Sequence, residues 1–315
     1  MKQTSFSSLD YQHKKIQTKR EKFLNEMELV VPWERLLKIV EPHYPKQGKG
    51  RSPLPMEVML RIYFLQQWYA LSDPAAEESL YDIESMRRFA LLDLGTDALP
   101  DESSILNFRH LIEKHGLSQI IFEDINQYLE EQGIKVSKGT MVDATIIHAP
   151  SSTKNQKKQR DPEMKSTRKN NQFFFGMKIH IGTDLNSNAI HSATVTSANI
   201  ADIDELPKLL RPDDLVVSGD AGYTSDTYKR GARSLGMTWN VNDKRKPKKN
   251  LSSSQKKRNR KLSQVRARVE HCFRVIKCQF GYRKTRYNGL EKNRVQVMTL
   301  LGLANLYMQR KKLMG

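Results

Sequence analysis

Residues 139–147, GTMVDATII, mark the point at which the pattern of the sequence changes. Before this stretch the apolar periodicity predicts helices only, one of which, at residues 55–71, is apolar nearly all round and should be buried. The stretch itself predicts a strand that contains Asp143. Two further strands are predicted at residues 173–184 and 189–198, and they are separated from each other by hairpin distance. Helices and strands then alternate. The sequence therefore predicts an α/β domain preceded by an all-helical region.

The chain is strongly basic. Its 315 residues, enough for one large or two ordinary domains, include 53 Lys and Arg against 35 Asp and Glu, which gives a formal net charge of +18. Such an excess indicates a polyanionic partner, most often nucleic acid, with a membrane surface as the alternative. We expect no transmembrane helix and no secretory signal, because the sequence has no long apolar run and no apolar stretch after the charges at its N-terminus. Cys272 and Cys278 fit neither a zinc-binding nor a redox spacing, which indicates reduced thiols in a cytosolic protein.

A second predicted strand ends on a carboxylate. Residues 215–219, LVVSG, lead directly into Asp220, and the small residues Ala221 and Gly222 come next. A strand that ends on an aspartate beside small residues presents the carboxylate at the mouth of a sheet. In a basic protein, a carboxylate in this position suggests metal ions and phosphates.

A third acidic residue, Glu270, lies on the predicted helix at residues 262–280. It shares one helix face with three cations at spacings of three and four residues, Arg266, Arg274 and Lys277. Such a face can form ordinary ion pairs, and taken alone this is the preferred interpretation. It can also complete a metal site while the cations hold phosphates.

The three carboxylates together favour the metal interpretation. Phosphodiester chemistry uses two hard cations about 3.5–4 Å apart, one beside the attacking oxygen and one beside the leaving oxygen. Magnesium prefers carboxylate oxygens and keeps several waters, so few protein ligands suffice. Two strand aspartates and one helical glutamate meet that need.

Several stretches carry a resemblance to a known family. In the second half of the chain they are GTMVDATIIHAPSSTKN, QRDPEM, FFFGMKIHIGTD, DAGY and RARVEHCFRVIKCQFGYRKTRYNGL; in the first half they are VVPWERLLKIVEPHYPK, MLRIYFLQQWYALSD and LPDESSILNFRHLIEKH. Together they resemble the DDE transposases of bacterial insertion sequences, and more narrowly the insertion sequence five family. The resemblance covers nearly the whole chain. It implies an RNase H-like mixed sheet flanked by helices at residues 136–315, preceded by an all-α N-terminal DNA-binding domain at residues 1–135.

The resemblance also implies a catalytic and metal-binding triad, Asp143, Asp220 and Glu270. Two Mg²⁺ ions per active site are expected, with Mn²⁺ as a substitute. Without cations, three close carboxylates would repel and raise one another's pKa.

Transposases of this class carry a Tyr, Arg, Glu, Lys signature at spacings of three, four and seven. Arg266, Glu270 and Lys277 match it, whereas Ser263 stands where the signature has tyrosine. By this resemblance, Arg266 and Lys277 hold the phosphate of the transposon end or the displaced strand.

Other basic residues are expected to contact the DNA backbone. Residues 243–261 hold ten Lys and Arg without a strong apolar period, which predicts a basic insertion loop that contacts phosphates; a solvated linker is the alternative. Lys178 and His180 alternate onto one strand face that borders the candidate site. The full set of candidate DNA contacts is Arg266, Lys277, Lys178, His180, Arg274, Lys244, Arg245, Lys246, Lys248, Lys249, Lys256, Lys257 and Arg258.

The implied function is that of a cut-and-paste DNA transposase. It would bind the terminal inverted repeats of its element, cleave a strand at the element's end and join the freed 3′-hydroxyl to double-stranded target DNA in the same site. We expect a homodimer or a higher oligomer on DNA, in the bacterial cytoplasm and on the nucleoid when DNA-bound. Two alternatives stay open: a catalytically silent, transposase-derived regulator that binds DNA, and an RNase H-like nuclease that cuts without joining.

Overall fold

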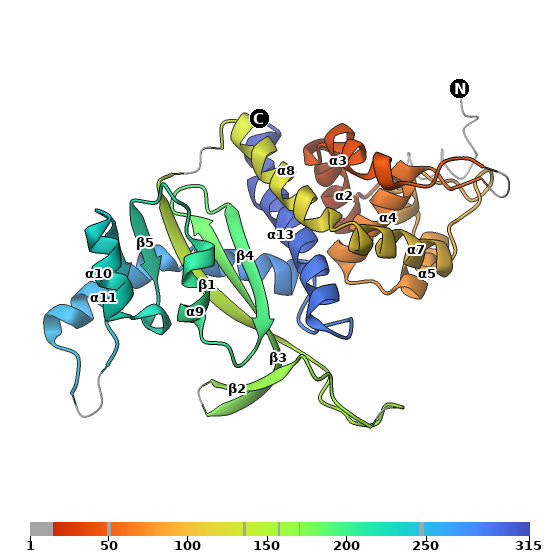
Figure 1. Ribbon diagram of the computed structural model, residues 1–315. Helices are drawn as coiled ribbons and strands as arrows, with labels where there is room; N and C mark the ends of the chain where they lie inside the picture. Colours follow the sequence, from red (N-terminus) through yellow and green to blue (C-terminus); the bar gives the residue numbers. More distant parts are fainter. Residues whose placement is uncertain (1–14, 49–51, 135–136, 157, 170, 246–248) are drawn as a thin grey trace. The chain divides into compact units, whose positions relative to one another are not determined.

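The structure is a computed structural model that describes residues 15–48, 52–134, 137–156, 158–169, 171–245 and 249–315 (Figure 1). It divides into two compact units. Unit 1 comprises Met1–Leu117 with Gln309–Gly315, and unit 2 comprises Ser118–Met308. The predicted domain boundary between residues 135 and 136 stays a prediction.

Unit 1 is helical, as the sequence predicts. Its helices are α2 (Lys19–Val30), α3 (Trp33–Val40), the 3₁₀ turn η1 (Glu41–His43), α4 (Met56–Tyr69), α5 (Asp73–Asp82), α6 (Glu84–Phe89) and α7 (Glu102–Lys114). Every residue of α4 from Val58 to Trp68 is buried, which confirms the helix predicted to be apolar nearly all round. Aromatic rings pack around it, with the centroids of Trp68 and Phe89 5.4 Å apart.

Unit 2 is built on a mixed six-stranded sheet. Its strands are β1 (Gly139–His148), β2 (Lys165–Lys169), β3 (Gln172–Asp184), β4 (Ile190–Ser197), β5 (Val216–Gly219) and β6 (Thr238–Val241). The order is β2-β3-β1-β5-β6, and β4 also pairs with β3. β1 and β4 run antiparallel to β3, whereas β5 runs parallel to β1 and β6 parallel to β5. This arrangement confirms the predicted mixed sheet with its three strands followed by helix–strand alternation.

Helices flank the sheet of unit 2. They are α8 (Leu117–Glu131), α9 (Asp202–Leu209), the 3₁₀ turn η2 (Ala221–Tyr223), α10 (Asp226–Ser234), α11 (Ser253–Arg266), α12 (Val269–Arg274), the π turn η3 (Val275–Gln279) and α13 (Leu290–Leu313). α9 covers one face, where Leu206 and Leu209 join a core cluster with Val142 and Val217. Because successive strand residues point to opposite faces, Asp143 points away from this cluster, toward α11 and α12. None of the helices in the described ranges is long and apolar enough to cross a membrane.

Three local predictions differ from the structure. The polar, basic sequence of residues 151–172 predicts a loop. In the structure this stretch contains β2, a polar strand that forms because β3 offers it a partner. The basic stretch 243–261 is predicted as a loop throughout, yet α11 begins at Ser253, where Ser252 and Gln255 form a capping box. The helix predicted at 262–280 is interrupted after Arg266 and continues as α12 and a π turn.

Candidate active site

A small cavity opens at one edge of the sheet in unit 2. Its volume is about 200 Å³. Strands β1, β2 and β3, the start of α9 and the end of β5 supply its lining: Ala144, Thr145, Ile146, Thr167, Arg168, Lys169, Lys178, Asp202 and Asp220. One predicted acid, Asp220, and one predicted cation, Lys178, therefore lie in the same cavity.

The parallel register of β1 and β5 places two of the predicted carboxylates together. Met141 pairs with Ser218, and each strand reaches an aspartate two residues later, Asp143 in β1 and Asp220 just after β5. Equal spacing from a paired position sets both side chains on the same face at the same level. The Asp220 charge acts on Asp143 and helps to raise its pKa.

The side chain of Asp143 is mostly buried, with 14% of its surface exposed. Burial raises the pKa of this carboxyl to about 6, against the opposing effects of the Arg266 guanidinium and the Ala144 N–H. Arg266 Nη1 lies 3.3 Å from Asp143 Oδ2, and the Ala144 N–H donates to Oδ1 at 2.9 Å. Arg266 is thus the cation that balances Asp143 in this structure.

Asp220 sits where the chain turns out of β5. Its Oδ1 accepts a hydrogen bond from the Gly222 N–H at 2.8 Å and so caps the short turn η2. A side chain at Gly222 would begin 2.9 Å from Asp220 Oδ1 and 3.7 Å from Asp202 Oδ2. The small residue after Asp220 therefore leaves room beside the carboxylate, as its position in the sequence suggests.

Glu270 lies at the second position of α12, and its side chain is 66% exposed. Arg266 Nη2 lies 3.9 Å from Glu270 Oε1, while the same guanidinium holds Asp143. A single arginine therefore lies between two of the three predicted carboxylates. The ion-pair interpretation of the helix face is correct for Arg266 and Glu270 in this structure.

Lys277 binds strand β1 instead of facing solvent. Its Nζ donates to Thr145 Oγ1 at 2.6 Å and to the Ile146 carbonyl at 2.8 Å. Burial lowers the pKa of Lys277, and the nearby Lys169 adds to that effect. The Lys277 ammonium group therefore lies beside Thr145, two residues beyond Asp143 along β1. Arg274, on α12, is exposed.

Lys178 and His180 share one strand face, as predicted, and both reach Asp202. Lys178 Nζ donates to Asp202 Oδ1 at 2.9 Å and to the Ile200 carbonyl at 2.7 Å. His180 is fully buried, with Nε2 2.8 Å from Thr196 Oγ1 and Nδ1 3.8 Å from Asp202 Oδ1. Burial lowers the pKa of His180 to about 4. We leave His180 out of the proposed DNA contacts because its ring has no surface open to a phosphate.

Asp202 and Tyr223 are two site residues that the sequence reasoning missed. Asp202 resembles a helix cap in the sequence, but the N-cap position of α9 is Ala201, and Asp202 binds Lys178 instead. Tyr223 is fully buried, and its hydroxyl has no hydrogen-bond partner among the described residues. Burial and the charges of Asp202, Asp143 and Asp220 raise the pKa of Tyr223. The sequence carries no direct signal for the pairing of Asp202 with Lys178, because it depends on how β4 returns beside β3 and brings the start of α9 to Lys178.

The donor chemistry of these residues fits a divalent cation. Asp143 and Asp220 share a face and repel each other, and a hard cation would relieve that repulsion. Among the described residues, no group of three His, Cys, Asp or Glu is already gathered as a metal site. Arg266 would have to leave Asp143 before Glu270 could join the two aspartates.

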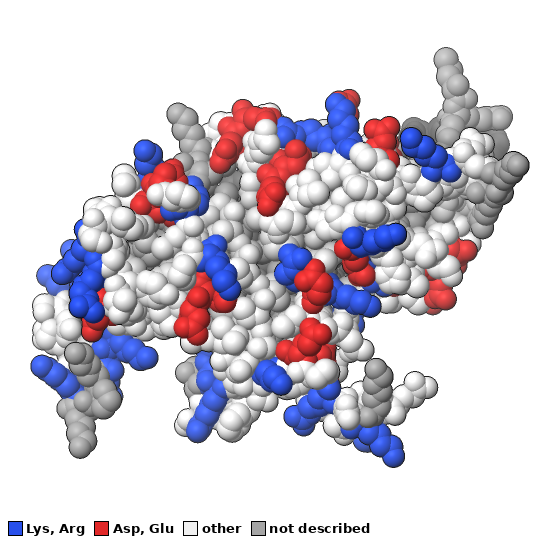
Figure 2. All heavy atoms as spheres, in the orientation of Figure 1, with Lys and Arg blue, Asp and Glu red and all other residues white. Residues whose placement is uncertain are grey.

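The basic stretch after β6 is an exposed surface. α11 buries none of its residues, and Arg258 fastens the helix to the Trp239 and Val241 carbonyls and to Asp243. The other described cations that were predicted here are exposed: Lys244, Arg245, Lys249, Lys256 and Lys257. The predictions for Lys246 and Lys248 lie outside the described residues. Figure 2 shows Lys and Arg side chains gathered over the end of unit 2 formed by α10 and α11.

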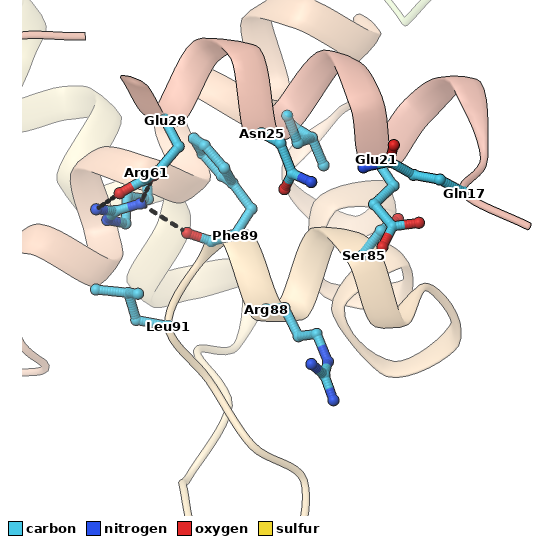
Figure 3. Close-up of a pocket in the computed structure, with 10 residues that line it drawn as sticks. Gln17, Glu21, Asn25, Glu28, Arg61, Ser85, Arg88, Phe89 and Leu91 are labelled. Carbon is cyan, nitrogen blue, oxygen red and sulfur yellow. Dashed lines mark hydrogen bonds and ion pairs between the residues drawn. The ribbon is translucent and has the colours of Figure 1, made fainter. Parts of the chain in front are cut away.

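A second, larger cavity of about 510 Å³ lies within unit 1 (Figure 3). Its cations are already paired with acids or carbonyls: Arg61 holds Glu28, Glu57 and the Phe89 carbonyl, and Arg88 holds Glu84. Its walls carry no pair of carboxylates facing a strand end, so we place the candidate active site in unit 2.

Two transposase family models match this chain. A family model described as "Transposase DDE domain" matches residues 135–306, and one described as "Transposase domain (DUF772)" matches residues 11–111. A cryo-EM structure of a piggyBac transposase synaptic complex with hairpin DNA is similar at 8% sequence identity and a TM-score of 0.46, over 91% of this chain and 72% of that chain.

Proposed function

The chain belongs to the transposase DDE domain family, and on this premise we propose that it cleaves and joins DNA strands with divalent cations held by Asp143, Asp220 and Glu270. The observation that carries the proposal is the shared register of β1 and β5, which sets Asp143 and Asp220 side by side. Membership of the insertion sequence five family stays a prediction.

The charges of the candidate site and of the whole chain support the proposed cofactor and substrate. Two buried or half-buried carboxylates need a cation, and Mg²⁺, with Mn²⁺ as a substitute, is the hard ion that carboxylates prefer. When bound, such ions would lower the pKa of a water and stabilise charge on the leaving oxygen. The net charge of +18 supports DNA as the polyanionic substrate.

Arg266 links DNA binding to the carboxylates. In this structure its guanidinium is divided between Asp143 and Glu270. A DNA phosphate offers the guanidinium a bidentate partner of higher charge. We propose that Arg266 moves to this phosphate, which frees both carboxylates to act as ligands. Lys277, already fixed to β1, would hold the same strand from the other side.

The proposed chemistry consists of two in-line displacements. In the first, a water oxygen bonds to phosphorus as the bond to the 3′-oxygen breaks, which leaves a 3′-hydroxyl and a 5′-phosphate. In the second, that hydroxyl attacks a phosphodiester of target DNA, and the target strand's own 3′-oxygen leaves. The same residues serve both steps because both have the same geometry.

We propose that the helical residues 1–135 bind the terminal inverted repeats and that two chains assemble on paired ends. The exposed cations of α11 would hold flanking phosphates. Arg109, on α7, is buried in ion pairs with Asp73 and Glu113 and is not among the proposed contacts.

A strand-transfer assay tests the function. Purified protein is mixed with labelled DNA carrying the end of its element, a target plasmid and Mg²⁺ or Mn²⁺. The test variant is Asp220→Asn, and Asp213→Asn, an exposed acid before the same strand, is the matched control. We expect joined product from the wild type and from Asp213→Asn, and none from Asp220→Asn.

Other outcomes would replace the proposal. Cleavage without joining would make the protein a nuclease. Tight binding of a verified element end with neither reaction would make it a regulator. Full activity of Asp220→Asn would remove Asp220 from the site.

A further inference from the structure

After β1 the chain forms a two-stranded extension of the sheet. It consists of β2 and residues 172–176 of β3, and we name it the β2–β3 ribbon. It projects below the rest of the sheet in Figure 1. Its base is fixed to the sheet, because the Ala149 N–H donates to the Phe175 carbonyl at 2.9 Å and the Ala198 N–H to the Gly176 carbonyl at 3.1 Å. Gly176 has φ 156°, and a side chain there would begin 2.1 Å from the Ile147 carbonyl oxygen. The ribbon is thus held close against β1 at a fixed point.

One face of the ribbon borders the carboxylates. Thr167 and Lys169 lie two residues apart on β2, so they share a face, and both line the cavity that contains Asp220. The Lys169 charge also reaches Asp143 and Lys277: it opposes the rise in the pKa of Asp143 and adds to the lowering of the pKa of Lys277. The end of the ribbon therefore lies over the candidate active site.

Arg168, between these two residues, also lines the cavity and brings a cation beside an aromatic ring. Arg168 pairs with Phe173 across the ribbon, and its guanidinium carbon lies 5.5 Å from the centre of the Phe173 ring. Arg160 lies in the same way over Phe175, 5.4 Å from the ring centre. Phe173 is nevertheless 73% exposed, so most of its ring is open to a partner.

This combination is suited to single-stranded nucleic acid. Bases of an unpaired strand stack on aromatic rings regardless of sequence, while nearby cations follow the phosphates. A base inside an intact duplex is already stacked on both sides and offers no free face. Lone exposed apolar residues are common at protein surfaces, but Phe173 differs in having an arginine partner, Arg168, that itself lines the cavity with Asp220.

We propose that the β2–β3 ribbon binds an unpaired segment of DNA next to the reacting phosphodiester, with a base stacked on Phe173 and the backbone held by Lys169 and Arg168. The proposal rests on the proposed function, since it assigns to that function a binding site for frayed or cleaved strand ends. It predicts a preference of the ribbon for single strands over duplex.

Fluorescence anisotropy in EDTA tests the proposal without cleavage. The probes are a labelled dT oligonucleotide of about 12 nucleotides and a random-sequence duplex of the same length. Phe173→Ala should weaken dT binding roughly tenfold, the loss expected from one base–aromatic stack, and leave duplex binding within about twofold of wild type. Phe173→Tyr should bind dT like the wild type. Leu235→Ala, which removes an apolar side chain that is 75% exposed outside the ribbon, should change neither affinity.

A tryptophan reporter gives a second, independent measurement. Stacking on a thymine should quench Phe173→Trp fluorescence more than wild-type fluorescence, and Leu235→Trp, an equally exposed reporter, should show no added quenching.

The results with Phe173→Ala separate this proposal from the function on which it rests. If the wild type binds both probes but Phe173→Ala binds dT normally, or loses dT and duplex equally, the stacking site is wrong and the proposed function stands. If the wild type binds neither probe, both proposals fail.

Discussion

Asp143 ionises at a cost, because burial removes water from its carboxylate while Arg266 offsets only part of the loss. The unfolded chain has an ordinary carboxyl at this position, with a pKa near 3.8, whereas the folded value is about 6. Between these values the folded state binds more protons than the unfolded state. The free energy of unfolding therefore falls as pH rises from about 4 to about 6 and is not reduced further above that range.

Asp143→Asn should remove this pH-dependent cost. In EDTA we expect the variant to unfold at a higher temperature than the wild type above pH 6, by an amount equivalent to about 1–3 kcal/mol. The difference should shrink toward zero near pH 4. Thermal melts followed by circular dichroism across this range check the prediction, and a lower melting temperature of the variant at pH 7.5 would contradict it.

Tyr223 carries a buried hydroxyl without a partner among the described residues. An unsatisfied buried polar group costs about 1–3 kcal/mol. Tyr223→Phe keeps the ring in its core cluster with Val142 and Val217 and should raise the free energy of unfolding by about 1 kcal/mol. Denaturant titration of the two proteins measures it; a loss of stability would show that the hydroxyl has a partner, such as a bound water.

The sequence identifies single acids more readily than the partners that surround them. Asp143 and Asp220 could be found because each interrupts or ends an apolar strand. The pairing of Asp202 with Lys178 could not, because it depends on how β4 returns beside β3. The spacing along one helix indicates the ion pair of Arg266 with Glu270, but it gives no sign that the same arginine also contacts Asp143.

At the scale of elements, the predictions hold where apolar periodicity is strong. β3, β4 and α4 lie where the pattern places them. β2 was missed because its sequence, KSTRK, has no apolar residue, and its strand form depends on the partner that β3 provides. α11 was missed in part for a similar reason: it buries no residue, and its start is set by the Ser252 capping box.

α11 should contribute to DNA binding through charge alone. We expect Lys256→Gln/Lys257→Gln to reduce the slope of log affinity against log salt by about 2 for duplex DNA, one per lost phosphate contact. The control is Lys138→Gln/Lys292→Gln, which removes two exposed lysines outside the basic stretch. Equal slopes for the two double variants would mean that α11 makes no specific phosphate contacts.

At the scale of the whole molecule, a bound cation should raise the free energy of unfolding. A ligand that binds only the folded state raises the free energy of unfolding, by about 2.7 kcal/mol at 100 times its dissociation constant. Mn²⁺ should therefore raise the melting temperature of the wild type and of Asp213→Asn but not of Asp220→Asn. A shift of equal size in all three proteins would place the bound ion outside the candidate site.

The division of the chain into units also sets the order in which the two units can be fully synthesised. Unit 1 includes Gln309–Gly315 as well as the first 117 residues, and Arg310 bonds to Glu26 at 2.8 Å. During translation, the ribosome must still add all of Ser118–Met308 after the first part of unit 1 emerges, which takes roughly ten to forty seconds. Unit 2 is then fully synthesised while unit 1 still awaits its last segment. A chain that ends before Gln309 would therefore lack part of the N-terminal helical unit while still containing the sheet and its carboxylates.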